Sequence, residues 1–453
     1  MKKTLTFRET LSVTSMLFGM FFGAGNLIFP ALMGQLAGRN VWIAVIGFCV
    51  TAVGLPLLGV AALGISRSDG LQSLSSKVGK GYGYFFTCAL YLSIGPFFAI
   101  PRCATVPFSI GIEPLLGSGS TALALVIFTV VFFALVLFFS LFPNGIMTWI
   151  GKILNPTFLL FLGVLVTVAL ISPATQIKQV EPVGDYAQQP FFEGFLAGYN
   201  TMDALAGLAF GIVVVQVICG LGLEEAGDVA GSTVRAGVFS CLFMGLIYLA
   251  VTVVGAQSRG AFEPAENGGV ALAQIARYYL GDAGMLVLAA TVTLACLKTA
   301  VGLITSCSEA FVGMFPKGPK YRVWAIIFSG ISFLFANLGL SAIIDYSLPV
   351  LMFLYPLSIV LILLALFGKF FRHDRRVYVF TIGFTFAAAI YDLLAALPES
   401  VRTLCRLDVP LEVLGKWLPM SELGLGWICP AAIGCAIGLA VMLLHQKKRS
   451  ENV

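Results

Sequence analysis

Long apolar stretches recur along this chain, and only short polar gaps separate them. Each stretch has about the length that a helix needs to cross a bilayer, roughly 20 residues. The longest gaps, at 172–190, 257–280 and 398–422, have no room for a soluble domain. We therefore predict an all-α integral membrane protein with a single transmembrane domain over residues 1–453. It has about twelve spans, at 10–36, 41–65, 82–100, 121–142, 148–171, 191–219, 233–256, 281–312, 323–337, 342–367, 377–397 and 423–445.

The first predicted span contains residues that weaken a helix at its centre. Gly19, Gly23, Gly25 and Asn26 lie there, and Pro30 follows. Glycine holds a helix poorly and proline removes a backbone donor, so the helix is predicted to break at mid-depth. In hydrocarbon such a break is tolerated only where it lines a protein cavity, as at a transporter's binding site. The alternative is an unbroken helix whose glycines pack against a neighbouring helix.

The sixth predicted span is interrupted in a similar way. Polar and helix-capping residues occupy the stretch from Gly198 to Asp203. Asn200, Thr201 and Asp203 are residue types that favour N-caps, so a second half-helix is predicted to begin inside the membrane. This span comes five spans after the first. The two breaks therefore fall at matching places in two five-span halves, which is typical of inverted-repeat transporters.

Two half-helices that meet at mid-depth suit an amino-acid zwitterion. The amides at the start of a half-helix carry about half an elementary charge and can hold a carboxylate without an arginine. The carbonyl ends of half-helices suit an ammonium group or Na⁺. The apolar side chains near the breaks either wall a pocket for an aliphatic side chain or face lipid and other helices. They are Phe21, Phe22, Met202, Leu205 and Phe210.

Composition supports a membrane protein and narrows its partners to the bilayer and a small solute. Hydrophobic residues make up 59% of the chain and charged residues 11%, whereas soluble domains carry about 25% charged residues. The net charge of +5 is interpreted through the positions of Lys and Arg in the loops, which set the orientation in the membrane, and no nucleic-acid partner is expected. Most Lys and Arg fall in the gaps on the side that carries both termini, which predicts that both termini are cytoplasmic.

The chain carries little that points to catalysis. Its two histidines, His373 and His445, lie beside basic residues, and no P-loop is present to indicate ATP coupling. A membrane-embedded enzyme would need a cluster of His, Cys or acidic residues at one depth. The sequence has no such cluster, so we expect no enzymatic activity and no cofactor besides a coupling ion. A channel is a further alternative to a carrier.

Several motifs together resemble the branched-chain amino-acid transporter (LIVCS) family of bacteria. They lie at 22–30, 95–102, 198–203, 295–303 and 337–340. The resemblance implies a Na⁺ symporter that imports leucine, isoleucine and valine across the cytoplasmic (inner) membrane. It also implies the leucine-transporter fold of the amino acid–polyamine–cation superfamily. In that fold, five-helix repeats at about 10–172 and 191–367 are inverted relative to each other, helices 1 and 6 are broken, and two additional helices follow at about 377–445.

The resemblance also assigns roles to individual residues. Substrate contacts are expected at both breaks, with Tyr91 closing over the substrate; the set is Phe22, Gly23, Ala24, Gly25, Asn26, Tyr91, Tyr199, Thr201, Met202 and Asp203. The four sodium ligands are expected to be the carbonyl oxygens of Gly19, Phe22 and Ala295 and the hydroxyl of Thr299.

Lys298 departs from the family pattern, because a small or apolar residue usually precedes this threonine. An unpaired lysine so deep in a span costs on the order of 3 kcal/mol. One hypothesis is that its charge replaces Na⁺, which would make the carrier Na⁺-independent or H⁺-coupled. The alternative is that Lys298 pairs with a carboxylate such as Asp203 or Glu309, or faces a wet cytoplasmic cavity.

Five other charged groups lie in or near the spans. Asp203 is the strongest functional candidate, since it could receive the substrate ammonium or a proton, or only cap the half-helix. Glu309, Asp345 and Asp392 lie near predicted span boundaries and are expected to be solvated. Arg102 follows Pro101 directly after a predicted span, so we expect it at the outer face.

Overall fold

The computed structural model describes residues 4–23, 25–66, 68–116, 121–142, 146–223 and 225–451. These residues form helices and contain no strand, which confirms the all-α prediction. The helices of the first half of the chain are α1 (Phe7–Phe21), α2 (Gly25–Ala37), α3 (Val41–Cys49), α4 (Leu55–Ile65), α5 (Leu71–Ser75), α6 (Lys80–Leu92), α7 (Ala99–Gly111), α8 (Thr121–Leu141) and α9 (Ile146–Ile171).

The second half of the chain continues in the same way. Its helices are α10 (Pro190–Ala197), α11 (Asp203–Gly220), α12 (Ala226–Ser258), α13 (Gly268–Met314), α14 (Tyr321–Ala336), α15 (Leu340–Leu366), α16 (Arg375–Ala395), α17 (Glu399–Leu404), α18 (Asp408–Gly415) and α19 (Ile428–Glu451). Two short turns matter for the site: the π-helical turn η3 (Ser93–Phe97) and the 3₁₀ turn η7 (Gly198–Thr201).

Nine helical stretches of the described residues are long and apolar enough to cross a membrane. This number is lower than the predicted twelve partly because α1 has 15 residues and α14 has 16. The long helix α13 bends at Gly281, where φ is 67°, and the bend coincides with the predicted start of a span at 281. An abundance of spanning helices identifies a multi-pass membrane protein.

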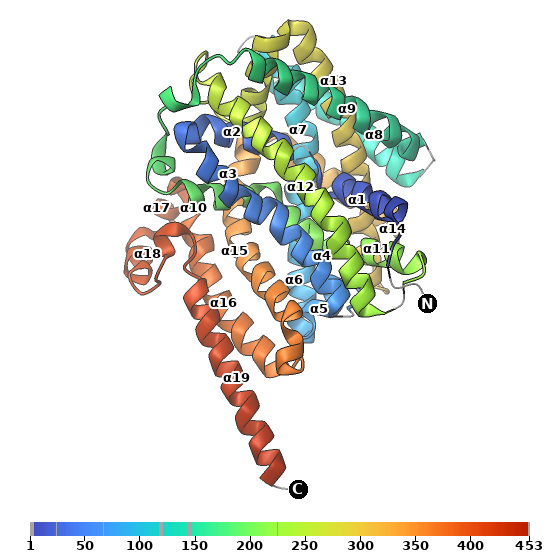
Figure 1. Ribbon diagram of the computed structural model, residues 1–453, viewed down its shortest axis with the longest axis vertical. Helices are drawn as coiled ribbons and strands as arrows, with labels where there is room; N and C mark the ends of the chain where they lie inside the picture. The colour runs from blue at the N-terminus through green and yellow to red at the C-terminus, as the bar shows by residue number, and fades with distance from the viewer. Residues whose placement is uncertain are drawn as a thin grey trace.

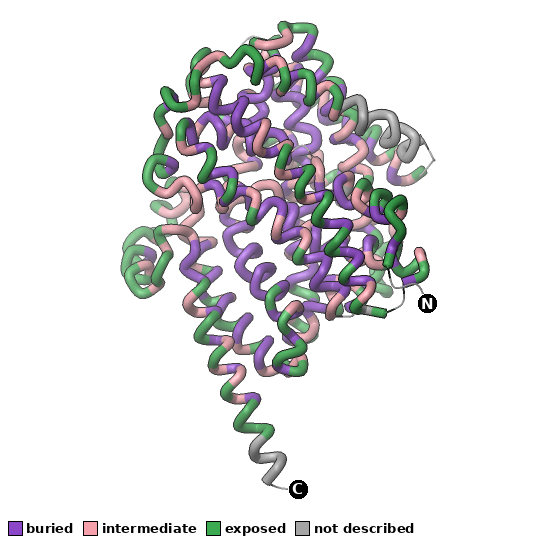
Figure 2. Tube along the Cα trace, viewed as in Figure 1, coloured by how far each residue is buried: buried purple, intermediate pink, exposed green. Residues whose placement is uncertain are grey.

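The helices pack around α13, which contacts α7, α9, α2, α14 and α8. In the same bundle α12 crosses α2, and α11 lies against α4 (Figure 1). Buried residues are concentrated inside this bundle (Figure 2). The helices α15, α16 and α19 pack successively against one another, and α19 projects beyond the bundle towards the C-terminus (Figure 1).

Glycine allows α2 and α12 to approach very closely. A Cβ on Gly34 would lie 2.1 Å from the Thr252 carbonyl oxygen, and a Cβ on Gly255 would lie 2.2 Å from the Ala31 carbonyl oxygen. Neither position can hold a side chain without separating the helices. This close crossing holds the start of α2 against the part of α12 that carries Tyr248.

The first predicted break is confirmed. Helix α1 ends at Phe21, Phe22 is extended with ψ of 101°, and α2 begins at Gly25. Two hydrogen bonds link the ends of the helices. The backbone N–H of Gly23 donates to Asn26 Oδ1 at 2.9 Å, and the backbone N–H of Asn26 donates to the Gly23 carbonyl at 3.2 Å. Ala24 lies outside the described residues.

The second predicted break is also confirmed. Helix α10 passes into η7, and Met202 then adopts the left-handed conformation with φ of 62° before α11 begins at Asp203. A non-glycine residue with positive φ is uncommon and costs of order 1–3 kcal/mol, so such residues are found where the surroundings impose them. The Thr201 hydroxyl accepts a hydrogen bond from the Asp203 amide at 3.3 Å, as an N-cap side chain would.

Candidate functional site

A cavity of about 80 Å³ lies between the two breaks. Three groups of elements surround it: the two ends of the first break, the second break with the start of α11, and the facing sides of η3–α7 and α13. Its lining residues are Phe21, Gly23, Gly25, Asn26, Ile94, Ala99, Arg102, Cys103, Asn200, Thr201, Met202, Asp203, Ala206, Phe210, Thr299 and Leu303. The cavity is thus mostly apolar, with one positive and one negative side chain.

Asn26, Asp203 and Tyr248 form a buried network that joins the two breaks; we call it the cavity network. The Asn26 amide nitrogen donates to Asp203 Oδ2 at 2.6 Å and to the Tyr248 hydroxyl. The Tyr248 hydroxyl, from α12, donates to the same Asp203 oxygen at 3.3 Å. All three side chains are at most 3% exposed. Both of these bonds to Asp203 reach Oδ2, and Asp203 also lines the cavity.

Arg102 provides the positive charge of the cavity, and the expectation that it lies at the outer face is wrong. Its side chain is 4% exposed. One guanidinium nitrogen donates to the Asn200 carbonyl at 2.7 Å, and the other donates to the Ser347 hydroxyl. The guanidinium carbon lies 5.3 Å from the ring centroid of Phe29. Its Nε has no hydrogen-bond partner among the described residues.

The error over Arg102 has a physical cause. Pro101 suggested that a span ends at residue 100, whereas helix α7 begins at Ala99 and continues to Gly111. Proline is tolerated in the first turn of a helix, because the backbone donor that it lacks would have no partner there. The third span therefore continues past Arg102.

The predicted sodium ligands lie on two helices. Gly19 is in the last turn of α1 and Phe22 follows its end, while Ala295 and Thr299 lie one turn apart on α13. The Thr299 hydroxyl donates to the Ala295 carbonyl at 3.1 Å, so these two oxygen atoms are neighbours. Thr299 also lines the cavity. The assignment of these four residues to Na⁺ stays a prediction.

Lys298 is partly exposed and, within the described part of the chain, forms no hydrogen bond or ion pair. The alternative in which it pairs with Asp203 or Glu309 is therefore wrong. Asp203 is engaged by Asn26 and Tyr248, and Glu309 is exposed.

The predicted substrate residues divide into two groups. Those at the cavity are Gly23, Gly25, Asn26, Thr201, Met202 and Asp203. Phe22, Tyr91, Tyr199 and Leu205 are not part of its lining. The Phe22 ring stacks on Phe18 with centroids 4.8 Å apart, and the Tyr91 hydroxyl donates to the Ala209 carbonyl at 2.9 Å. Leu205 is buried at 0% exposure, as is Tyr199, which stacks on Tyr355.

Several cavity residues escaped the sequence analysis, among them Ile94, Ala99, Cys103 and Leu303. Ala99 and Leu303 lie within the family motifs at 95–102 and 295–303, but as ordinary apolar residues they gave no sign that they face a cavity, and no motif marks Ile94 or Cys103. A further correction concerns Asp392, which is 2% exposed and not solvated. Asp345, like Glu309, is exposed.

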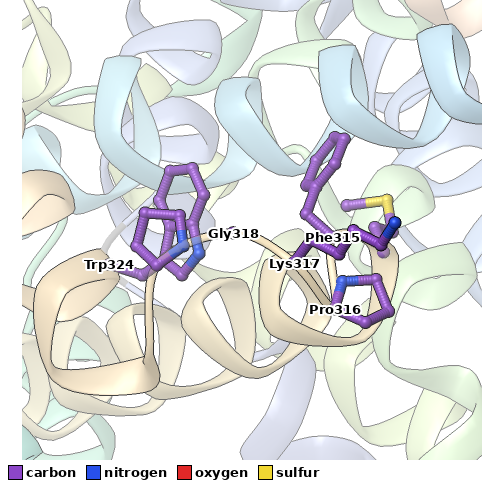
Figure 3. Close-up of a pocket in the computed structure, with 7 residues that line it drawn as sticks. Phe315, Pro316, Lys317, Gly318 and Trp324 are labelled. Carbon is purple, nitrogen blue, oxygen red and sulfur yellow. The ribbon is translucent and has the colours of Figure 1, made fainter.

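A larger hollow of about 670 Å³ lies where α13 ends and the chain turns into α14. Figure 3 shows Phe315, Pro316, Lys317, Gly318 and Trp324 around it. Lys317 is the single charged residue of its lining. A zwitterion needs groups of both signs, so the smaller cavity between the breaks is the better substrate site.

Comparison with known proteins places the chain in a family. The family model described as "Branched-chain amino acid transport protein" matches residues 6–445. The chain belongs to this family. The resemblance noted from the motifs is thereby confirmed, and the protein is a membrane transport protein and not an enzyme.

Relatives within the family match over their full length. The chain is 52% identical to the branched-chain amino acid permease BrnQ of Lactobacillus delbrueckii subsp. lactis, over 99% of this chain and 100% of the relative. It is 40% identical to the permease of the same name from Bacillus subtilis (strain 168), again over 99% and 100%.

Two solved transporters share the fold. One is Mhp1, a nucleobase-cation-symport-1 family transporter in a closed conformation with bromovinylhydantoin bound; its TM-score is 0.61 at 15% identity, over 97% of this chain and 93% of that one. The other is MhsT in complex with L-phenylalanine, with a TM-score of 0.56 at 15% identity, over 98% and 99%. At this identity the likeness concerns the fold alone.

Proposed function

We propose that this protein is a secondary active transporter that imports leucine, isoleucine and valine across the bacterial cytoplasmic membrane by Na⁺ symport. The observation that carries the proposal is the cavity between the two breaks, where Arg102 and Asp203 provide opposite charges within a mostly apolar lining. The names of the relatives, branched-chain amino acid permeases, support the same substrate class.

In this proposal the cavity recognises the two charged ends of an amino acid separately. The substrate carboxylate accepts hydrogen bonds from Arg102, whose Nε has no other partner among the described residues. The amides at the start of α11 add a partial positive charge. The substrate ammonium donates to Asp203, which the cavity network holds in place. Hydrogen bonds between charged groups contribute about 1.5–3 kcal/mol each.

The apolar lining provides selectivity for a branched side chain. Phe21, Ile94, Met202, Phe210 and Leu303 present hydrocarbon or thioether surface to the cavity. Each buried methylene group contributes about 0.8 kcal/mol, so leucine, with three more carbons than alanine, gains roughly 2 kcal/mol. Polar side chains would lose hydration in this lining without replacing it.

Transport follows from rocking of the half-helices around this fixed site. The proposal includes about twelve spans, inverted repeats at about 10–172 and 191–367, two further helices, and cytoplasmic termini. Na⁺ would bind the carbonyls of Gly19, Phe22 and Ala295 and the hydroxyl of Thr299, and so brace α1 against α13 when the substrate is present.

A second candidate is a Na⁺-independent or H⁺-coupled carrier. Lys298 supports it, because this ammonium group precedes Thr299 and has no partner among the described residues. A fixed positive charge close to the predicted ligands would compete with Na⁺ for them.

Uptake of amino acids into liposomes that contain the purified protein tests these proposals. We expect saturable uptake of the three branched amino acids, exchange against internal leucine, and no accumulation when choline replaces Na⁺. Undiminished accumulation in choline would overturn Na⁺ symport in favour of the second candidate. Non-saturable flux without exchange would indicate a channel.

A further inference from the structure

A second buried polar group lies behind the break of the sixth span. It comprises Tyr199 of η7, Tyr355 of α15, Asp392 of α16 and Trp427, just before α19; we call it the rear cluster. These side chains are 0%, 0%, 2% and 6% exposed. Each has a buried polar atom that makes no hydrogen bond of ordinary geometry with the described residues: both tyrosine hydroxyls, Asp392 Oδ2 and Trp427 Nε1.

The four side chains are neighbours. The rings of Tyr199 and Tyr355 stack with centroids 3.9 Å apart and planes inclined by 16°. The charge of Asp392 acts on the Tyr199 hydroxyl, and the Trp427 N–H lies close to that hydroxyl. A Cβ on Gly426, the residue before Trp427, would lie 3.5 Å from Asp392 Oδ1. Such a group of unpaired buried polar atoms from four elements is rare in a native protein and calls for an explanation.

The rear cluster is linked to the substrate cavity through Tyr355. The Tyr355 hydroxyl interacts electrostatically with Asp203, Thr201 and the backbone of Ala204. Asp203 and Thr201 line the cavity. The two stacked tyrosines therefore lie between the cavity on one side and Asp392 on the other.

Asp392 has no compensating charge. Arg402 of α17 is the basic residue at the same end of α16, but it donates to the Ala395 carbonyl at 3.3 Å and lies 3.7 Å from Asp408. The helices around Asp392 carry other titratable residues nearby, which are Tyr391 on α16, Cys429 and Cys435 on α19, Glu422 before α19, Asp408 and Glu412 on α18, and Lys416 at the end of α18. Their remaining charged residues, among them Arg375, Arg376, Asp345 and His445, lie more than a dozen residues from Asp392 or Trp427 along their helices or on a different helix end. An ionised carboxylate buried without a partner costs several kcal/mol.

The chemistry of the neighbours favours a proton over a metal ion at Asp392. Trp427 Nε1 can only donate a hydrogen bond, and its N–H dipole repels a cation. Tyrosine hydroxyls donate as well as accept, so they suit a neutral carboxyl group or a bridging water. A Na⁺ site would instead present several oxygen ligands.

We propose that Asp392 is a proton-binding site of the transport cycle, linked to the substrate cavity through Tyr199 and Tyr355. Its carboxylate takes one proton from water on one side of the membrane and returns it to water on the other, so one proton accompanies each substrate in addition to Na⁺. The proposal rests on the carrier function above. The charge on Asp392 acts on Tyr199, and hence on the η7 segment that rearranges when the carrier changes state.

Leucine uptake into liposomes with equal Na⁺ on both sides and acid outside tests this assignment. For the wild type we expect leucine accumulation and acidification of the lumen, read with an internal pH dye. For Asp392→Asn we expect at least tenfold less accumulation and no leucine-dependent acidification, with exchange of external for internal leucine preserved. The matched control Asp345→Asn removes an exposed carboxylate of α15 and should behave as the wild type.

The outcomes separate the two proposals. Acidification by Asp392→Asn equal to that of the wild type overturns the proton site, whereas a wild type without leucine exchange overturns the carrier itself. If Asp392→Asn does not exchange leucine, the proton site is tested instead by infrared difference spectra of the wild type with and without leucine. The proposal predicts a carbonyl band of a protonated carboxyl group that responds to leucine in the wild type. This band should be absent from Asp392→Asn and shifted in Tyr199→Phe. If the wild type has no such band, the proposal is overturned.

Discussion

The cavity network and the rear cluster are both buried, yet only the carboxylate of the cavity network accepts hydrogen bonds from side chains in the part of the chain that the structure describes. Asp203 accepts hydrogen bonds from Asn26 and Tyr248. Asp392 accepts none from the described residues. Both side chains are at most 3% exposed.

The difference teaches what each carboxylate is suited to do. The hydrogen bonds from Asn26 and Tyr248 fix the position of Asp203 and offset part of the cost of burying its charge, which suits the recognition of an ammonium group. Without such bonds, burial disfavours the ionised form of Asp392, so its protonation can follow changes in its surroundings. A bonded carboxylate serves as a fixed ligand, whereas an unbonded one is suited to bind and release a proton.

The largest expected effect comes from removing the positive charge that faces Asp203 in the cavity. Arg102→Gln should weaken leucine binding about 10- to 100-fold, because a charge-assisted bond of about 1.5–3 kcal/mol is lost. Calorimetric titration of the purified protein with leucine measures this. The control Arg277→Gln removes an exposed arginine paired with Asp282 and should leave the affinity unchanged. Equal affinity in Arg102→Gln would remove this residue from the substrate site.

On stability, as opposed to substrate affinity, breaking the cavity network should have the largest effect. Asn26→Ala removes the bonds to Gly23, Asp203 and Tyr248 together. We expect a loss of about 2–4 kcal/mol of stability, since buried polar groups remain unpaired. Thermal unfolding in detergent measures it. Asn40→Ala, which removes hydrogen bonds to the carbonyls of Tyr186 and Ala187, is the control and should lose about 1 kcal/mol or less. A similar loss in both variants would contradict the bridging role of Asn26.

Smaller changes in stability are expected when each of the two carboxylates is replaced by an amide. Asp203→Asn should cost about 1–3 kcal/mol, because its new amide competes with the donors of Asn26 and Tyr248. Asp392→Asn should change stability by no more than about 0.5 kcal/mol, since no bond is lost. Unfolding midpoints at neutral pH give both values. The comparison fails if Asp392→Asn proves the more destabilising variant.

The smallest effect concerns a titrating group outside the spanning helices. His373 lies between α15 and α16, where partial burial, Lys77 and Lys369 lower its pKa. The stability that it contributes is therefore present above its usual pKa of about 6.5 and is lost as the pH falls through the lower value in the folded protein. His373→Gln should reduce the fall in melting temperature between about pH 7 and about pH 5. An identical pH profile would exclude this contribution.

The sequence alone determined the two breaks. Glycine and asparagine near 23–26, and capping residues near 200–203, act through local backbone preference, which does not depend on distant neighbours. The same reasoning found Asp203 and Thr201, which line the cavity, but it could not exclude Phe22 and Tyr199, which lie in the breaks and are not part of the lining. The family motifs and the lengths of the apolar stretches likewise need no tertiary contact to be recognised.

Only the tertiary structure decided which other residues face the cavity. Arg102 was placed outside the membrane because hydropathy locates the edge of a span and cannot tell whether a helix continues through a proline. Asp392 was expected in solvent, and Tyr199 at the substrate, for a related reason. The chain indicates roughly where a span lies, but where the helix ends, which way a side chain points and which group lies opposite are set by how helices far apart in sequence pack together.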